Sequence, residues 1–134
     1  MKILLVIFVL FTKFVNAEVI NVNNRELINL IEKNIKIIDV RTQNEWKSTG
    51  IIKGSFLMSL LNKNKKFIFK DWYEMFNNKF SKNKSIIFIC ASGVRSNYIS
   101  HLLKKQKPEL IIYNLKKGIN YWIRSGYKIQ RLSN

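Results

Sequence analysis

Residues 86–97 read IIFICASGVRSN, and this stretch decides both the fold and the place to look for chemistry. It begins as a strand that is apolar on both faces, ends that strand at Cys90, and continues through Gly93 and Arg95. An apolar strand that gives way to a glycine turn and then to a helix is typical of a covered parallel sheet. Cys90 is the only cysteine of the 134-residue chain, so it can form neither an intramolecular disulfide nor a multi-cysteine metal site.

Strands and helices alternate along the rest of the chain. Runs of apolar residues predict strands at 19–22, 35–40, 55–60, 85–90 and 110–115. Helical spacing of apolar residues and flanking glycines predict helices at 25–34, 42–48, 70–80, 95–106 and 118–126. Asn24 is the expected cap of the first helix. We therefore expect one domain at 18–134, a three-layer α/β/α fold with a mainly parallel central sheet.

The formal net charge is +16, a value typical of proteins that bind nucleic acids or anionic membranes. The lysines, however, are spread over several segments, with one dense cluster at 62–70, and no nucleic-acid motif is present. Lysine, asparagine and isoleucine are abundant even where nothing indicates binding. We interpret the charge as a compositional bias and expect no nucleic-acid partner.

Residues 1–17 have the layout of a secretory signal peptide. Lys2 precedes an apolar run at 3–11, and Val15 and Ala17 form a small-residue cleavage site. The run is shorter than the roughly 20 residues that a membrane-spanning helix needs. We expect cleavage after Ala17 and a periplasmic or secreted protein, with membrane contact only through an uncleaved signal segment. An uncleaved anchor and a buried N-terminal strand stay open as alternatives.

The place of Cys90 in the predicted sheet favours a functional thiol. Ligands of open α/β sheets bind beyond the carboxyl ends of the strands, which is where Cys90 lies. The loop that follows contains Gly93 and enters a helix, so successive N–H groups can point at an anion. A thiolate there is stabilised by those N–H groups, by the helix dipole and by Arg95. A small buried side chain without chemistry is the alternative.

Four segments then point to a known family. They read IIDVRTQNEW at 37–46, GIIKGSFLMSL at 50–60, CASGVRS at 90–96 and NLKKGINYWIRSGYKI at 114–129. In this order they resemble the opening motif, the G-H-I-x-G-A segment, the active-site loop and the closing motif of the rhodanese-like sulfurtransferases. Three positions depart from those motifs: Ile51 replaces a histidine, Ser55 an alanine, and Lys117 a glycine at the lip of the site.

The resemblance implies sulfur transfer in two steps. Cys90 would take a sulfane sulfur from a small anionic donor such as thiosulfate and hold it as a persulfide. It would then pass the sulfur to cyanide or to a thiol, including the thiol of a protein. The implied binding residues are those of the loop: Ala91, Ser92, Gly93, Val94, Arg95 and Ser96.

The resemblance gives Asp39 and Arg41 a supporting role, in which they brace the loop. Glu45 follows Arg41 at helical spacing, and we expect the two to form an ion pair. The resemblance implies no cofactor and no metal. His101, the only histidine, is expected in a surface or packing role.

The sequence leaves two other functions open. Cysteine phosphatases and arsenate reductases use a Cys-x5-Arg loop sized for a tetrahedral oxyanion, whereas four residues separate Cys90 from Arg95 here. A rhodanese fold without catalysis, acting as a binding module, is the second alternative, and the intact cysteine loop favours an enzyme over it. Because no second cysteine exists, the sulfur acceptor must come from outside the chain.

Overall fold

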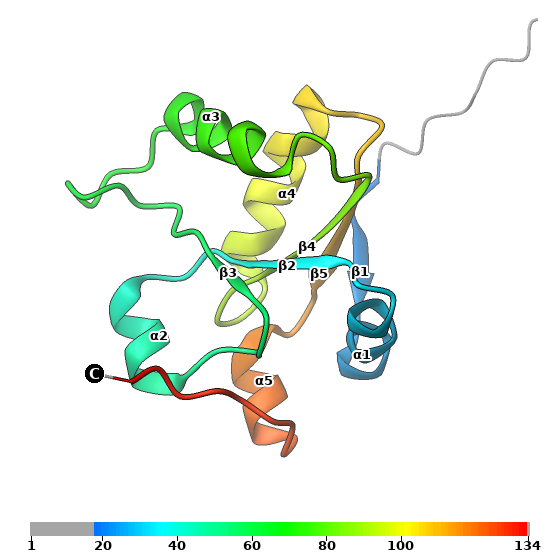
Figure 1. The fold of residues 1–134 in the computed structure, drawn as a ribbon, viewed down its shortest axis with the longest axis vertical. Helices are drawn as coiled ribbons and strands as arrows, with labels where there is room; N and C mark the ends of the chain where they lie inside the picture. Colours follow the sequence, from blue (N-terminus) through cyan, green and yellow to red (C-terminus); the bar gives the residue numbers. More distant parts are fainter. Residues whose placement is uncertain (1–17, 134) are drawn as a thin grey trace, which may run out of the picture.

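The structure is a computed structural model that describes residues 18–133 (Figure 1). The predicted signal peptide at 1–17 lies outside the described residues. The strands are β1 Ile20–Val22, β2 Lys36–Asp39, β3 Phe56–Leu57, β4 Ser85–Ile89 and β5 Ile111–Leu115. The helices are α1 Asn24–Glu32, α2 Gln43–Thr49, α3 Phe69–Phe80, α4 Val94–Gln106 and α5 Gly118–Arg124. Among residues 18–133, no helix is both long and apolar enough to cross a membrane.

The strands form one parallel sheet in the order β1-β5-β4-β2-β3, which confirms the α/β fold expected from the sequence. The apolar strand β4 lies at its centre, between β5 and β2. Helices α3 and α4 cover one face of the sheet and helices α1 and α5 cover the other (Figure 1). Because β4 is covered on both sides, its residues from Ile86 to Ile89 are fully buried.

Each face of the sheet has its own aromatic or aliphatic core. On the α3–α4 face, Trp72, Phe76 and Phe88 pack ring against ring, with centroids 5.6 to 6.2 Å apart. On the other face, Leu27 of α1 and Trp122 of α5 close over the sheet.

Most elements begin or end within two residues of the expected positions, and two differences stand out. Asn23, not Asn24, caps α1: its side chain accepts the N–H of Glu26, and the Glu26 carboxylate accepts the N–H of Asn23. This reciprocal pair needs a glutamate three residues after the cap, which only Asn23 has. β3 covers 56–57 instead of 55–60, although the N–H groups of Met58 and Leu60 still donate to the carbonyls of Asp39 and Val40, at 3.0 and 3.3 Å.

Parallel pairing brings the ends of β2, β4 and β5 to one edge of the sheet. The N–H of Val40 donates to the carbonyl of Ile89 at 3.0 Å, so the residues after β2 and β4 leave the sheet side by side. Cys90 is the first residue beyond β4.

Candidate active site

Cys90 lies at the base of the loop between β4 and α4, and its exposed fraction is 0%. The N–H of Gly93 donates to Cys90 Sγ at 3.1 Å, and the Ser96 hydroxyl donates at 3.3 Å. Gly93 has a φ of +91°, the left-handed region that turns the loop back over its own cysteine. Two hydrogen-bond donors therefore converge on the one sulfur.

The start of α5 is hydrogen-bonded to the backbone of this loop. The N–H groups of Ile119 and Asn120 donate to the carbonyls of Cys90 and Ala91, at 2.9 and 3.1 Å. Gly118 has a φ of +70°, and a Cβ at this position would overlap the Ala91 carbonyl. The glycine of the closing motif is therefore needed for the close approach of two backbones. The sequence contains this signal, but its role in shaping the cysteine loop is visible only in the fold.

Arg95, in the first turn of α4, forms an ion pair with Glu45 of α2. Its two terminal nitrogens donate to the two carboxylate oxygens, each at 2.8 Å, across 50 positions of sequence. The expected pair of Glu45 with Arg41 is wrong, because the Arg41 side chain turns into the protein instead. The hydrogen bond from Arg95 holds the pKa of Glu45 below its usual value, and the same bond raises the pKa of Arg95.

Asp39 and Arg41 form a buried ion pair. The Arg41 Nη2 lies 2.8 Å from Asp39 Oδ2, and both side chains are at most 1% exposed. The remaining Arg41 donors reach the Thr49 hydroxyl and the Gly50 carbonyl, at 2.6 and 2.8 Å. These contacts tie the end of β2 to the end of α2. That both residues brace the cysteine loop stays a prediction, since these contacts reach Thr49 and Gly50.

The other predicted loop residues are placed differently. Ala91 is half-buried, Ser92 is exposed, and Val94 directs an apolar side chain to solvent with 71% of it exposed. Lys117 is exposed, and its Nζ lies 4.4 Å from the centroid of the Tyr121 ring. The structure thus gathers Gly93 and Ser96 on the sulfur. It does not bring the side chains of Ser92 and Val94 there.

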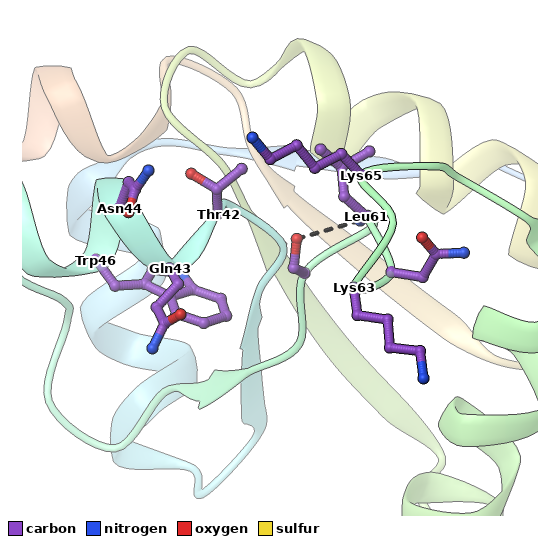
Figure 2. Close-up of a pocket in the computed structure, with 9 residues that line it drawn as sticks. Thr42, Gln43, Asn44, Trp46, Leu61, Lys63 and Lys65 are labelled. Atoms are coloured by element: carbon purple, nitrogen blue, oxygen red, sulfur yellow. Dashed lines mark hydrogen bonds between the residues drawn. The ribbon is translucent and has the colours of Figure 1, made fainter.

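A cleft of about 410 Å³ opens between the start of α2 and the loop that follows β3 (Figure 2). The Asn62 carboxamide accepts the N–H groups of Asn64 and Lys66, at 2.9 and 3.0 Å, and so holds this loop in a tight turn. The cleft is lined by Thr42, Gln43, Asn44, Trp46, Ser59, Leu61, Asn62, Lys63 and Lys65.

The chain is similar in sequence to a known family and to a known protein. The family model of the rhodanese-like domain matches residues 23–125. The chain is 35% identical over 100 residues to an uncharacterized protein of Rickettsia prowazekii (strain Madrid E), covering 66% of this chain and 72% of that one.

Solved structures share the fold. A rhodanese-like domain protein from Staphylococcus aureus is 25% identical with a TM-score of 0.64, over 85% of this chain and 99% of that one. A Rhodopseudomonas palustris CGA009 protein of unknown function, described as a possible tyrosine phosphatase, is 19% identical with a TM-score of 0.65, over 87% and 88%. Reduced Bacillus anthracis CoADR-RHD is 23% identical with a TM-score of 0.58 over 78% of this chain, which spans only 16% of that longer chain.

Proposed function

The chain belongs to the rhodanese-like domain family, and from this premise we propose that it is a sulfurtransferase that carries sulfane sulfur on Cys90. The observation that best supports the proposal is the pair of donors on Cys90 Sγ, from the Gly93 N–H and the Ser96 hydroxyl. Donors placed around a thiolate equally suit a persulfide, which carries its negative charge on the added sulfur.

Both steps of the proposed sulfur transfer balance in atoms and electrons without a cofactor. The Cys90 thiolate attacks the outer sulfur of thiosulfate, the S–S bond of thiosulfate breaks, and sulfite leaves with the electron pair. Cys90 then bears a persulfide anion. Cyanide or a thiolate attacks the outer sulfur of this persulfide, forms thiocyanate or a new persulfide, and returns Cys90 to the thiolate.

Arg95 is the proposed contact for the anionic end of the donor. Its guanidinium can bind two oxygens of a sulfonate as it now binds two oxygens of Glu45. Cys90 has no exposed surface in this structure, so a donor reaches its sulfur only after the loop opens. When Arg95 binds the donor, it releases Glu45. This exchange of partners would couple opening of the loop to binding of the donor.

The phosphatase alternative is kept because one structural relative is described as a possible tyrosine phosphatase. That relative is 19% identical, a level at which only the fold is shared. The four-residue gap between Cys90 and Arg95 gives a tighter ring than the phosphatase loop. The intact cysteine and its two donors also favour an enzyme over a non-catalytic binding module.

We further propose that the protein is exported, with the signal peptide removed after Ala17. The sulfur acceptor there is a small thiol, cyanide or the thiol of another protein.

One assay separates the three functions. Purified protein is incubated with thiosulfate and cyanide, and thiocyanate is measured; a parallel sample receives p-nitrophenyl phosphate. The proposal predicts thiocyanate formation that Cys90→Ser abolishes, with no release of nitrophenol. Cysteine-dependent release of nitrophenol would support the phosphatase, and neither product would support the binding module.

A further inference from the structure

We propose that Asn114 of β5 is a positioning residue for the cysteine loop. Its carboxamide, oriented by Asn21 of β1, holds Gly93 in the place from which the Gly93 N–H reaches Cys90 Sγ. The part of Asn114 in sulfur transfer rests on the proposed function. The burial of Asn114, the partners of its side chain and the backbone around Gly93 support the role.

Asn114 is a buried polar residue in β5, whose other four residues are aliphatic or aromatic. It is 2% exposed and is paired with Phe88 of β4 in the register of the sheet. The Oδ1 atom of Asn114 has no hydrogen-bond partner among residues 18–133. Burial of an amide oxygen without a partner costs free energy, and an apolar side chain would avoid that cost. Stability therefore does not account for an asparagine at this position.

The Nδ2 atom of Asn114 connects the edge strand β1 with the cysteine loop. It donates to Asn21 Oδ1 at 3.1 Å, and it forms a long hydrogen bond of 3.5 Å with the Gly93 carbonyl oxygen. Asn21 is paired with Asn114 in the register of β1 and β5. Because a peptide carbonyl only accepts hydrogen bonds, the contact with Gly93 requires the amide nitrogen and directs the Asn114 oxygen away. The contact with the loop thus leaves that oxygen unpartnered.

Gly93 lies against the backbone that leaves β5, and a Cβ at Gly93 would overlap the Lys116 carbonyl. The Gly93 carbonyl accepts the N–H of Asn97 at 3.1 Å, the first hydrogen bond of α4. The Gly93 N–H donates to Cys90 Sγ at 3.1 Å. The φ of +91° and ψ of −9° at Gly93 set the angle between its two peptide groups. A contact that holds the carbonyl of Gly93 therefore also directs its N–H toward the sulfur.

The role predicts that Asn114→Leu is as stable as the wild type. Leucine has the same branching as asparagine and removes the unpartnered oxygen from the core. The Gly93 carbonyl keeps its hydrogen bond from Asn97, and Asn21 is exposed and can turn to water, so no new buried group loses its partner. The midpoint of urea unfolding is therefore expected to be equal to or above that of the wild type.

The same variant is expected to transfer sulfur more slowly. Without the contact from β5, the Gly93 N–H is less well placed on Cys90. The maximal rate of sulfur uptake from thiosulfate, followed by intact mass in rapidly quenched samples, is expected to fall about tenfold, the effect of one lost hydrogen bond. The thiosulfate concentration that gives half of this rate should not change, because Arg95 is untouched.

The backbone amide of Gly93 reports on its position without any sulfur transfer. The chain contains five glycines, so glycine-selective isotope labelling gives five backbone amide signals in an NMR spectrum. The signal that shifts most in Cys90→Ser identifies Gly93. Its hydrogen exchange is expected to be about tenfold faster in Asn114→Leu, while exchange at Gly50, which donates to the Trp46 carbonyl, stays the same. Unchanged exchange at Gly93 would overturn the inference.

Asn77→Leu is the matched control. Asn77 Oδ1 is also buried without a partner among residues 18–133, but Asn77 lies in α3, near the end that leads into the start of β4. The substitution there removes the same kind of oxygen and is expected to change neither Gly93 exchange nor sulfur uptake.

Two variants of Asn21 test the role without a change in the core. Asn21→Ala removes the acceptor for Asn114 Nδ2 and is expected to slow sulfur uptake about threefold. Asn21→Asp keeps an acceptor at this position and is expected to keep the wild-type rate. Equal rates in Asn21→Ala and Asn21→Asp would contradict the orientation of Asn114 by Asn21.

Exchange and sulfur uptake together separate the positioning role from the proposed function. If the wild type takes up no sulfur while Asn114→Leu exchanges faster at Gly93, the positioning of Gly93 stands and the transferase is rejected. If the wild type takes up sulfur and Asn114→Leu does so at the same rate, the transferase stands and the role of Asn114 is rejected.

Discussion

Arg95 and Glu45 meet end to end: Arg95 Nη1 donates to Glu45 Oε1 and Arg95 Nη2 donates to Glu45 Oε2, each at 2.8 Å. Arg95 lies in the first turn of α4, directly after the cysteine loop, and Glu45 lies in α2. The side chains are 39% and 32% exposed, so this is a pair at the surface that solvent can reach. Such pairs contribute only about 0.2–1 kcal/mol, and a substrate anion can compete with one. The pair therefore positions the Arg95 side chain, and a substrate anion can still displace Glu45 from it.

Glu45→Gln is expected to lower the KM for thiosulfate about two- to fivefold, because the donor no longer competes with a carboxylate for Arg95. The control is Glu109→Gln, before β5, for which no change is expected. Steady-state kinetics at low ionic strength measure the effect. A rise of the KM in Glu45→Gln would show instead that Glu45 holds Arg95 in its donor-binding geometry.

The same substitution predicts a pH dependence. Arg95 holds the pKa of Glu45 below its usual value of 4.5, so the carboxylate stays charged at neutral and mildly acidic pH. The difference in KM between wild type and Glu45→Gln is therefore expected to be constant from about pH 8 to about pH 5. It shrinks only at lower pH, as the wild-type carboxyl takes up its proton. A difference that vanished above pH 5 would contradict the assignment.

Asp39→Asn is expected to destabilise the domain by about 3–5 kcal/mol, because it leaves the buried Arg41 cation without its partner. Asp71→Asn, at an exposed position of α3, is the control and should have a far smaller effect. Urea unfolding measures both free energies. A loss below about 1 kcal/mol for Asp39→Asn would show that the pair does not brace the fold.

Gly118→Ala and Gly126→Ala separate backbone strain from displacement of the loop. Both glycines have positive φ, so each alanine costs about 1–2 kcal/mol. Only Gly118 meets the Ala91 carbonyl; a Cβ at Gly126 meets nothing within 4 Å. We expect Gly118→Ala to reduce sulfur transfer about a hundredfold and Gly126→Ala to leave it unchanged, as measured by thiocyanate formation. Equal activities in the two variants would refute the role of Gly118 in shaping the loop.

Export is tested on the protein from its host. The layout of residues 1–17 predicts a mature chain that begins at Glu18. N-terminal sequencing or the intact mass identifies the terminus. Recovery of the chain with Met1 or Lys2 at its start from the cytosol would exclude cleavable export.

The part of the site that could be predicted from the sequence is formed by residues that are close together in the chain. Cys90 at the end of an apolar strand, followed by Gly93, requires a tight loop at the carboxyl edge of a parallel sheet. The donors on its sulfur come from within six positions of Cys90. Short-range patterns of this kind are visible in a single sequence.

The part that it missed depends on distant contacts. Helical spacing predicted an ion pair between Glu45 and Arg41. In the structure Arg41 is buried against Asp39, and Glu45 pairs with Arg95 instead. Lys104 is a second example: it is a lysine followed by Lys105 and Gln106 at the end of α4, yet it is buried and its amine donates to the Leu110 carbonyl. Burial lowers the pKa of that amine. Neither arrangement follows from residue spacing, because each is set by the packing of other elements.

The persulfide itself is the most direct measurement of the central claim. Incubation of the wild-type protein with thiosulfate is expected to add one sulfur atom, about 32 Da, to the intact mass. Cyanide should then remove that mass and release thiocyanate. Cys90→Ser, which is nearly the same size, should fold and gain no mass. A wild-type mass that stays unchanged with every sulfane donor tried, or a Cys90→Ser variant that gains the same 32 Da or so, would contradict the assignment of Cys90 as the sulfur carrier.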